Sequence, residues 1–321
     1  HFGANASSAG GGAVHVVICA LDYQKTQFPL TCSLDGRNMS ELAQLCGANI
    51  HTLLNDDATV ANVSSLVRQV GSRCGPADFF VFYYAGHGAN LPDQDGDEDD
   101  GQDEAFCLVD ENGKTSPDSW LRDDDFATLV TSSVHAETRI LILADCCHSG
   151  TVADLGRPLW SGYHVVSMSG CRDQQTSGDT GQGGIFTHSL LLAVEGLSGR
   201  QQAYSVGEVY RETLQVKASV FSCTQDISIQ CVPDDALSWP LVPPASYVAP
   251  LKRAVVASAA GGQSEERLPT LLQSESPSKS GHKAPAGREL AGPDVVSGKG
   301  GCCFWRRTRS SLDKRALAGG A

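Results

Sequence analysis

The stretch that decides the fold is Arg139-Ile140-Leu141-Ile142-Leu143-Ala144-Asp145-Cys146-Cys147-His148-Ser149-Gly150. Its first half is a run of large apolar residues without polar alternation, which predicts a β-strand buried on both faces. The strand stops at an acid, two thiols, a histidine and a glycine. Parallel sheets carry their reactive groups at the carboxyl ends of the strands, so we expect a functional site there.

A second buried strand is predicted at residues 78–84, and it ends in Ala85-Gly86-His87-Gly88. The small residues allow the backbone to turn sharply and hold one imidazole at the strand tip. The two strands would therefore deliver His87 and Cys147 to one edge of a sheet.

The remaining pattern predicts alternating strands and helices, which indicates a parallel sheet with right-handed crossovers. Residues 32–38 follow the first strand as part of a loop, which places Asp35 in that loop. The Ser205 cap and Glu208 have the spacing of a capping box. The predicted strands are 14–21, 50–54, 78–84, 105–109, 139–143, 163–168 and 227–232, and the predicted helices are 38–46, 59–70, 121–131, 185–196 and 205–216.

The chain has 321 residues, enough for one large core or two modest ones. We expect a Gly-rich N-terminal remnant at 1–13, one α/β domain at 14–249 and a tail at 250–321. The tail is rich in Ser, Gly, Ala and Pro with few large apolar residues, so we expect it to be disordered. No stretch approaches 18 uninterrupted apolar residues, which argues against a membrane span.

Charge divides the chain in two. From residue 250 onward there are 12 basic and 6 acidic residues, whereas residues 1–249 contain 12 basic and 31 acidic ones. Such an acidic body repels nucleic acid and attracts cations or basic peptides.

The twelve cysteines are scattered through predicted strands and helices, unlike the dense framework of a small secreted domain. This distribution predicts a reducing, cytoplasmic environment with most thiols packed in the core. No CxxC pair is present to indicate a zinc site.

Cys147 and His87 together have the chemistry of a nucleophile and its base. A thiol reacts as thiolate, and His87 can take its proton and return it to a leaving amine. Gly88 and Gly150 leave room for a substrate carbonyl beside backbone N–H groups. The alternative for Cys147 is an inert packed cysteine.

Three blocks resemble the signatures of metacaspases, which are caspase-fold cysteine peptidases. They are residues 84–88, 145–150 and 169–177, within a match over about Val14 to Pro244. The resemblance implies an α/β caspase-like three-layer sandwich, with a mainly parallel central sheet flanked by helices. It also implies Cys147 as nucleophile, His87 as base, and the N–H groups of Cys147 and Gly88 as oxyanion hole. The stretch Asp145 to Gly150 departs from the Q-A-C-[RQG]-G signature of caspases.

Specificity for basic residues is predicted by two acids. Asp145 lies two residues before the thiol, and two carboxylates, Asp35 and Asp145, would favour Arg or Lys before the scissile bond. The resemblance implies that Cys32 joins them in the pocket. At a fourth pocket position, where the family often has Ser, this chain has Ala85. The alternative role for either acid is a helix cap or a turn.

Calcium is suggested by residues 90–104, which carry eight acids and do not match an EF-hand loop. The resemblance implies activating calcium bound through Asp103, Asp123, Asp124 and Asp154, with a register that could shift toward Asp125. A solvated acidic loop is the alternative. If Asp154 binds the ion, the linker at 151–161 would be drawn toward the acidic loops.

Three features remain outside this scheme. Arg157 is the self-cleavage candidate in a linker as short as that of type I metacaspases. Cys146 is predicted to be a packed neighbour, with a redox role as the alternative. Cys302 and Cys303, beside a basic cluster, suggest a palmitoylated contact with an anionic membrane, against an unstructured basic end.

The expected protein is thus a monomeric, calcium-dependent cysteine endopeptidase that cleaves protein or peptide substrates after Arg or Lys. One alternative is a catalytically silent caspase-fold module that binds calcium or partners. Another is a different thiol hydrolase or a redox protein on the same sheet.

Overall fold

The computed structural model describes residues 12–234, except 97, 99, 100, 173, 174, 176, 179, 182, 200–203 and 222. The predicted tail at 250–321, with Cys302 and Cys303, lies outside the described residues. Within them, no helix combines the length and apolar character that crossing a bilayer requires.

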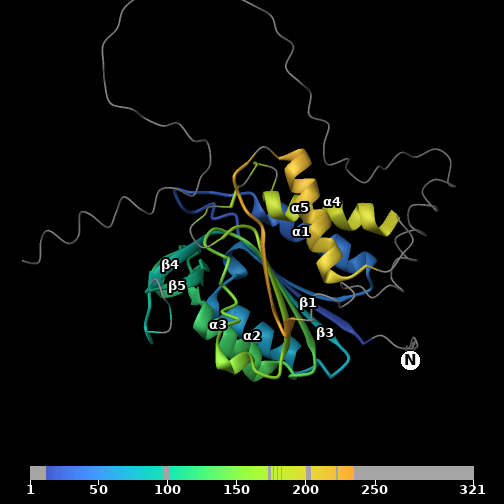
Figure 1. Ribbon diagram of the computed structural model, residues 1–321. Coiled ribbons are helices and arrows are strands. Elements are labelled where there is room, and N and C mark those ends of the chain that lie inside the picture. The colour runs from blue at the N-terminus through green and yellow to red at the C-terminus, as the bar shows by residue number, and fades with distance from the viewer. Residues whose placement is uncertain are drawn as a thin grey trace, which may run out of the picture.

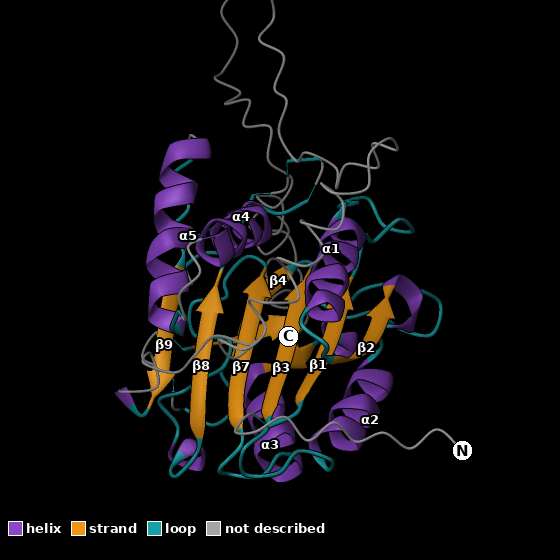
Figure 2. Ribbon diagram, turned by 90° about the vertical axis from the view of Figure 1, so that its right-hand side faces the viewer, coloured by secondary structure: helices purple, strands orange, loops and turns teal. Residues whose placement is uncertain are grey.

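A six-stranded sheet forms the centre of the protein, with strand order β2-β1-β3-β7-β8-β9 (Figure 2). Its first five strands are parallel, and β9 pairs with β8 in the antiparallel sense. The strands are β1 (Val14–Ala20), β2 (Asn49–Leu54), β3 (Phe79–Ala85), β7 (Arg139–Asp145), β8 (His164–Ser169) and β9 (Ser228–Val232).

Helices cover both faces of the sheet. Figure 1 shows α1, α4 and α5 on one face and α2 and α3 on the other. The predicted three-layer α/β sandwich with a mainly parallel sheet is therefore confirmed. The helices are α1 (Cys32–Leu45), α2 (Val60–Gly71), α3 (Asp123–Ser133), α4 (Ile185–Gly199) and α5 (Val206–Val220), with short 3-10 helices at Asn55–Asp57, Pro117–Ser119 and Pro158–Trp160.

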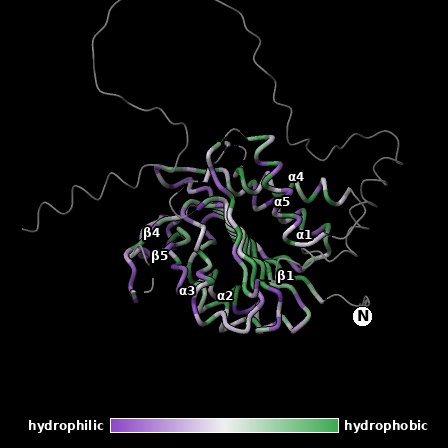
Figure 3. The backbone as a smooth tube through the Cα atoms, in the orientation of Figure 1, coloured by the Kyte–Doolittle hydropathy of each residue, from purple (hydrophilic) through white to green (hydrophobic). Residues whose placement is uncertain are grey.

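The core lies along the central strands, where Figure 3 shows the most hydrophobic part of the chain. Every residue of β3 is buried, as the absence of polar alternation predicts. Phe82 of β3 packs against Phe106 and Phe126 with ring centroids 5.8 and 4.7 Å away. Each buried aromatic side chain contributes about 1.5–3 kcal/mol, so this group fixes α3 and the neighbouring hairpin on the sheet.

A second sheet beside the first was not anticipated. Strands β4 (Gly88–Pro92), β5 (Gln102–Phe106) and β6 (Leu121–Arg122) pair antiparallel in the order β4-β5-β6. The predicted strand at 105–109 overlaps only the end of β5. The prediction failed because β4 and β6 are short and because most of β4 and β5 lies within the acidic run at 90–104.

Helix α1 begins six residues earlier than predicted. It starts at Cys32, so Asp35 lies in its first turn and not in a loop. Gly36 suggested a turn, but in the structure it lies within α1, where the helix closely approaches the sheet. A Cβ there would lie 2.8 Å from the Cβ of Ala20 and 3.3 Å from Cδ2 of Leu54. The glycine lets α1 pack tightly over β1 and β2.

The expected N-terminal cap of α5 is present. The Ser205 hydroxyl accepts from the amide N–H of Glu208 at 3.2 Å, and the Glu208 carboxylate accepts from the amide of Ser205 at 2.7 Å. The capping box predicted from the spacing is therefore confirmed.

Candidate active site

The two predicted reactive residues follow neighbouring strands. Strands β3 and β7 pair in register, with Ala85 opposite Asp145. His87 and Cys147 each come two residues after this pair. The amide N–H of Gly86 donates to the carbonyl of Asp145 at 3.2 Å and continues the contact beyond the strands. The structure thus brings the imidazole and the thiol to the same edge of the sheet.

Gly88 is required at this edge by the closeness of two backbones. A Cβ at Gly88 would lie 1.9 Å from the carbonyl oxygen of Cys147 and 3.2 Å from Sγ of Cys146. No side chain fits in that space, so the segment after His87 lies directly against the backbone of Cys147. The residues predicted to form an oxyanion hole are therefore adjacent.

The imidazole of His87 is oriented by a main-chain carbonyl. Its Nε2 lies 2.8 Å from the carbonyl oxygen of Phe28, in the loop after β1. A carbonyl only accepts hydrogen bonds, so Nε2 carries the hydrogen and Nδ1 is the basic nitrogen of the neutral ring. This tautomer suits a general base that acts through Nδ1.

Two tyrosines fix the backbone of His87. The Tyr23 hydroxyl accepts from the His87 amide N–H at 2.9 Å and donates to the carbonyl of Cys107 at 2.6 Å. The Tyr84 hydroxyl donates to the His87 carbonyl at 2.7 Å. The Tyr23 and His87 rings lie 4.5 Å apart, and Tyr23 has a φ of 52°. Strain of this kind persists only where the surroundings determine the conformation.

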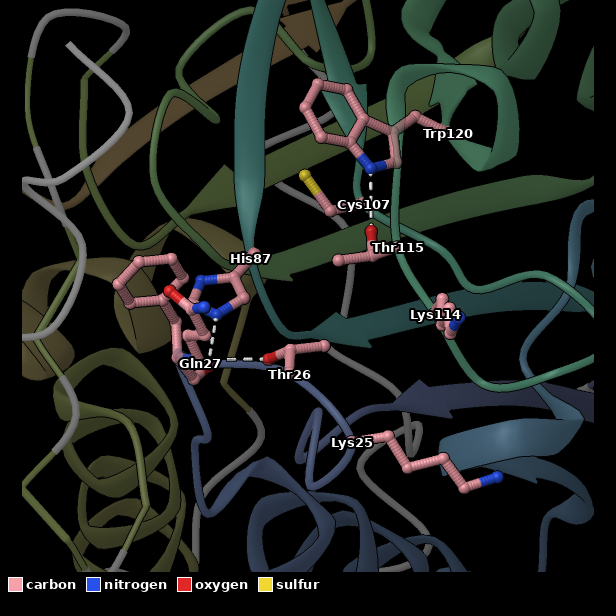
Figure 4. Close-up of a pocket in the computed structure, with 9 residues that line it drawn as sticks. Lys25, Thr26, Gln27, His87, Cys107, Lys114, Thr115 and Trp120 are labelled. Atoms are coloured by element: carbon pink, nitrogen blue, oxygen red, sulfur yellow. Dashed lines mark hydrogen bonds between the residues drawn. The ribbon is translucent and has the colours of Figure 1, made fainter. Parts of the chain in front are cut away.

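A cavity of about 240 Å³ opens beside His87 (Figure 4). Trp120 closes one side of it, with the indole Nε1–H donating to the Thr115 hydroxyl at 2.7 Å. His87 is thus one of the residues that line this cavity. Its other lining residues are Lys25, Thr26, Gln27, Phe28, Cys107 and Lys114.

The Cys147 thiol is covered. The residue is 2% exposed, and its S–H points at the carbonyl oxygen of Ser177, 3.9 Å away. The neighbouring Cys146 lies in the core, and burial raises the pKa of its thiol well above the usual range. A thiol with so high a pKa is a poor nucleophile, which agrees with the prediction that Cys146 is a packed neighbour.

Asp145 accepts three hydrogen bonds at the end of β7. Its Oδ1 accepts from the Ser177 hydroxyl at 2.7 Å, and its Oδ2 accepts from the amide and the hydroxyl of Thr187 at 2.9 and 2.7 Å. Burial nevertheless raises the pKa of this carboxyl above its ordinary value, because the hydrogen bonds offset only part of the lost hydration.

Asp35 and Asp145 both contact the chain segment at residues 183–187. Oδ2 of Asp35 accepts from the amide of Gly184 at 2.8 Å. A Cβ at Gly183 would lie 2.2 Å from Oδ1 of Asp35, and one at Gly184 would lie 2.1 Å from Oδ2 of Asp145. Glycines 183 and 184 therefore cover both carboxylates.

Tyr83 is a buried tyrosine whose pKa responds to the predicted pocket residues. Its pKa is raised well above the usual range, first by burial, then by the charges of Asp35 and Asp145, and also by Cys32. Cys32, Asp35 and Asp145 are all buried and all act on this one tyrosine, so the three predicted pocket residues lie in the same region of the fold. Ala85 stands opposite Asp145 in β3 and is fully buried.

The predicted calcium ligands lie at the second sheet. Asp103 of β5 and Asp123 and Asp124 at the start of α3 place carboxylate oxygens within 4.8 Å of one another. Asp123 also belongs to a second group of this kind, with Glu98 and Glu104. Carboxylate oxygens are the ligands that calcium prefers, and each group would supply part of its coordination shell.

Two arginines enter the acidic groups. Arg122 pairs with Asp103, and Arg157 pairs with Asp124. Arg157 also bonds Asp95 at 2.8 Å and Asp154 at 3.3 Å. Asp154 is thereby connected to Asp124 through the guanidinium of Arg157.

The charge of the cluster fits a divalent cation. The pKa of Asp123 is raised to about 7, first because it is buried and also because Asp103 and Glu98 lie near it. Carboxylates crowded in this way gain from a hard cation that neutralises them. Asp103, Asp123, Asp124 and Asp154 are the residues that would hold it, with Glu98 and Glu104 close by.

A comparison of the sequence with protein-family profiles finds a match in the first part of this domain. A family profile described as "Metacaspase, peptidase C14 domain" matches residues 15–156, which include the ends of β1, β3 and β7. This part of the chain belongs to the metacaspase family.

Similar metacaspases occur in plants and fungi. "Metacaspase-2" of Arabidopsis thaliana is 29% identical over 223 residues, covering 57% of this chain and 52% of the relative. "Metacaspase-1" of the same plant is 28% identical over 57% of this chain and 60% of the relative. "Metacaspase-1" of Cryptococcus neoformans is 37% identical over 32% of this chain and 23% of its own length. The chain thus spans about half to three fifths of the two plant relatives.

A solved structure shares the fold of this metacaspase. The crystal structure of a Geobacter sulfurreducens protein superposes with a TM-score of 0.55 at 24% identity. The match covers 71% of this chain and 97% of that protein. It supports the α/β architecture described above.

Several groups at the metacaspase site escaped the sequence analysis. The Phe28 carbonyl orients His87, but a main-chain group leaves no trace in residue type. The sequence did not indicate Tyr23, because its hydroxyl is placed by a backbone conformation with positive φ that the residue type does not reveal. Glu104 is 2% exposed, and the Thr151 hydroxyl donates to its carboxylate at 2.6 Å. Only its place in the acidic run at 90–104 could have indicated it.

Proposed function

We propose that this metacaspase is a calcium-activated cysteine endopeptidase that cleaves after Arg or Lys. The observation that carries the proposal is the position of His87. Its ring is fixed by the Phe28 carbonyl at the edge of the sheet where the Cys147 backbone lies against Gly88.

The chemistry assigned to this pair is acyl transfer. His87 takes the proton of the Cys147 thiol, and the thiolate attacks the scissile carbonyl carbon. The N–H groups of Gly88 and Cys147 stabilise the resulting oxyanion. His87 then gives its proton to the leaving amine, and water hydrolyses the thioester with His87 as base.

The acidic pocket supports the choice of substrate. Asp35 and Asp145 both act on Tyr83, and each carboxylate accepts a hydrogen bond from a neutral backbone amide, that of Gly184 or Thr187. A guanidinium or ammonium group would exchange those neutral donors for charge-assisted hydrogen bonds. An acidic side chain would meet two like charges, so peptides with Asp before the scissile bond would be rejected.

The acidic cluster supports calcium as the activating ion. Bound calcium would supply the positive charge that joins carboxylates which otherwise repel one another. Asp154 lies seven residues beyond Cys147, in the segment that connects the nucleophile to β8. Asp154 can therefore transmit ion binding to the covered thiol.

Peptide cleavage tests the proposal. Wild type, Cys147→Ala and Asp145→Ala are assayed with Arg-, Lys- and Asp-coumarin peptides, with and without calcium. We expect wild type with calcium to cleave the Arg and Lys peptides, and Cys147→Ala to lose at least about a thousandfold in kcat. Asp145→Ala should lose kcat/KM for Arg and Lys peptides.

Three outcomes would count against parts of the proposal. Peptidase activity that is unchanged when calcium is chelated would contradict the proposed calcium activation. A preference for the Asp peptide would contradict the assignment of Asp35 and Asp145 as the residues that select Arg or Lys. Equal activity of Cys147→Ala and wild type would contradict the assignment of Cys147 as the nucleophile.

The buried thiol favours one alternative, a catalytically silent module that binds calcium or partners. Cys147 is covered by the carbonyl of Ser177, so the described conformation does not expose it to a substrate. Calcium binding without cleavage of any peptide by wild type would establish this alternative.

A further inference from the structure

Arg157 occupies the middle of the acidic cluster. Its three guanidinium nitrogens each contact a different carboxylate: Nη1 that of Asp124, Nη2 that of Asp95 at 2.8 Å, and Nε that of Asp154 at 3.3 Å. The side chain is only 22% exposed. A planar guanidinium is well suited to bridging several carboxylates.

Two of these carboxylates are the ones assigned to calcium. Calcium takes six to eight oxygen ligands at about 2.3–2.6 Å, and such a shell leaves no room for a guanidinium on the same oxygens. Asp124 and Asp154 can therefore bind either Arg157 or the ion. The two states exclude each other.

The chain around Arg157 is anchored on both sides. Trp160 is fully buried, and its indole Nε1–H donates to the Ala153 carbonyl at 3.0 Å. The Thr151 hydroxyl is bonded to Glu104 at 2.6 Å. Exchange of the cation therefore requires movement of the Arg157 side chain and of the short segment between these anchors.

Arg157 is poorly placed as a self-cleavage site. The bond after it leads to Pro158, whose nitrogen carries no hydrogen and whose ring crowds the leaving group. Its guanidinium is also engaged by three carboxylates and so is withheld from a specificity pocket. These features favour an electrostatic role.

Arg122 differs from Arg157 in its contacts. It pairs with Asp103 and also donates to the Pro92 carbonyl at 3.1 Å, which ties it to the hairpin of the second sheet. Only Arg157, among the described residues, bonds three carboxylates and belongs to the linker that follows Cys147.

We propose that Arg157 is a tethered cation that fills the carboxylate cluster of the metal-free protein and must leave Asp124 and Asp154 when these residues bind calcium. The inference rests on the proposed calcium dependence. In this proposal, Arg157 determines the calcium concentration at which the site fills. The apparent calcium affinity is the intrinsic affinity multiplied by the fraction of molecules in which the arginine has left the site.

Calcium titration by calorimetry tests this in the full chain. Cys147→Ala is the background, so that self-cleavage cannot change the protein during the measurement. Arg157→Gln and Arg157→Lys are compared with the control Arg172→Gln. Arg172 also forms an ion pair, with Asp226, but is 72% exposed and lies outside the acidic cluster.

Arg157→Gln should bind calcium about tenfold more tightly than the background, because the competing cation is gone. Arg157→Lys should fall between them, since an ammonium cannot bridge three carboxylates. Arg172→Gln should stay within about twofold. Without calcium, Arg157→Gln should also unfold at a lower temperature than the background, and saturating calcium should close that gap.

Unchanged or weaker calcium affinity in Arg157→Gln would overturn the inference while leaving calcium binding intact. Absence of calcium binding in every variant, including the background, would overturn the calcium proposal and the inference with it. Tighter binding in Arg172→Gln equal to that in Arg157→Gln would show a general charge effect and would also overturn it.

Discussion

Tyr23 holds His87 through a single hydroxyl group. That hydroxyl accepts from the buried amide of His87 at 2.9 Å, and the left-handed backbone of Tyr23 is needed to place it. In Tyr23→Phe the amide loses its acceptor, which costs about 1–3 kcal/mol for a buried group. We expect kcat on an Arg peptide to fall about tenfold or more, with KM little changed, because the base is misplaced while the specificity pocket is intact.

Tyr204→Phe is the matched control for Tyr23→Phe. Tyr204 is also buried, at 6% exposure, but its hydroxyl has no hydrogen-bond partner among the described residues. Removing that hydroxyl should leave kcat unchanged. Equal losses in both variants, or no loss in Tyr23→Phe, would contradict the positioning role of Tyr23.

Asp145 should favour function at the expense of stability. Burial raises its pKa in the folded protein, so the carboxyl begins to destabilise the fold as the pH rises above the unfolded pKa of about 3.9, and the penalty is complete above the folded pKa. Asp145→Asn removes this penalty. We expect its melting temperature to exceed that of wild type at about pH 8, and the difference to shrink as the pH falls toward about 4, where the carboxyl becomes protonated in the unfolded state as well as in the folded one.

Cleavage of Arg peptides by Asp145→Asn should be lost over the same range. Asp226→Asn serves as a control, because this carboxylate is 53% exposed and lies in a surface ion pair. A melting temperature of Asp145→Asn below that of wild type at high pH would mean that the hydrogen bonds to Ser177 and Thr187 outweigh the burial penalty.

At the scale of elements, Gly36 determines how closely α1 packs. An alanine is the better helix former by about 1 kcal/mol, but its Cβ would press on Ala20 of β1 at 2.8 Å. Because both partners sit in the core, we expect Gly36→Ala to lower the melting temperature. Displacement of α1 would also move Asp35, so kcat/KM for Arg peptides should fall.

Gly196→Ala, in α4, provides the opposite case. The nearest atom to a Cβ there is Oε1 of Glu212 at 4.0 Å, so the substitution has room. It should stabilise the protein by about 0.5–1 kcal/mol through helix propensity alone. If both glycine variants are stabilised, close packing is not the reason for Gly36.

Sequence patterns predicted the elements that depend on continuous burial. Strands β3 and β7 were predicted because their apolar runs report burial on both faces. The start of α1 was missed because Gly36 responds to a neighbour distant in the sequence. Motifs at strand ends likewise predicted that residues 87 and 147 meet at one edge. The partners of Arg157 come from the connection between β4 and β5, the first turn of α3 and the linker itself, and no local pattern indicates such a meeting.

At the scale of the whole molecule, charge should influence how substrates arrive. Residues 1–249 contain 31 acidic and 12 basic residues, so the body attracts basic peptides over several ångströms. Salt screens this attraction, since the Debye length is about 10 Å at 0.1 M and shorter above it. We expect kcat/KM for an Arg peptide flanked by two lysines to fall several-fold between about 50 mM and about 300 mM KCl.

The matched peptide carries glutamines in place of the two flanking lysines and keeps the same cleavage residue. Its kcat/KM should change much less over the same salt range, because only the contact in the specificity pocket remains and that contact is buried. Calcium is held at saturation throughout, so that salt does not act through the metal site. Parallel salt dependence of the two peptides would place the effect on the enzyme itself and would contradict long-range attraction by the acidic body.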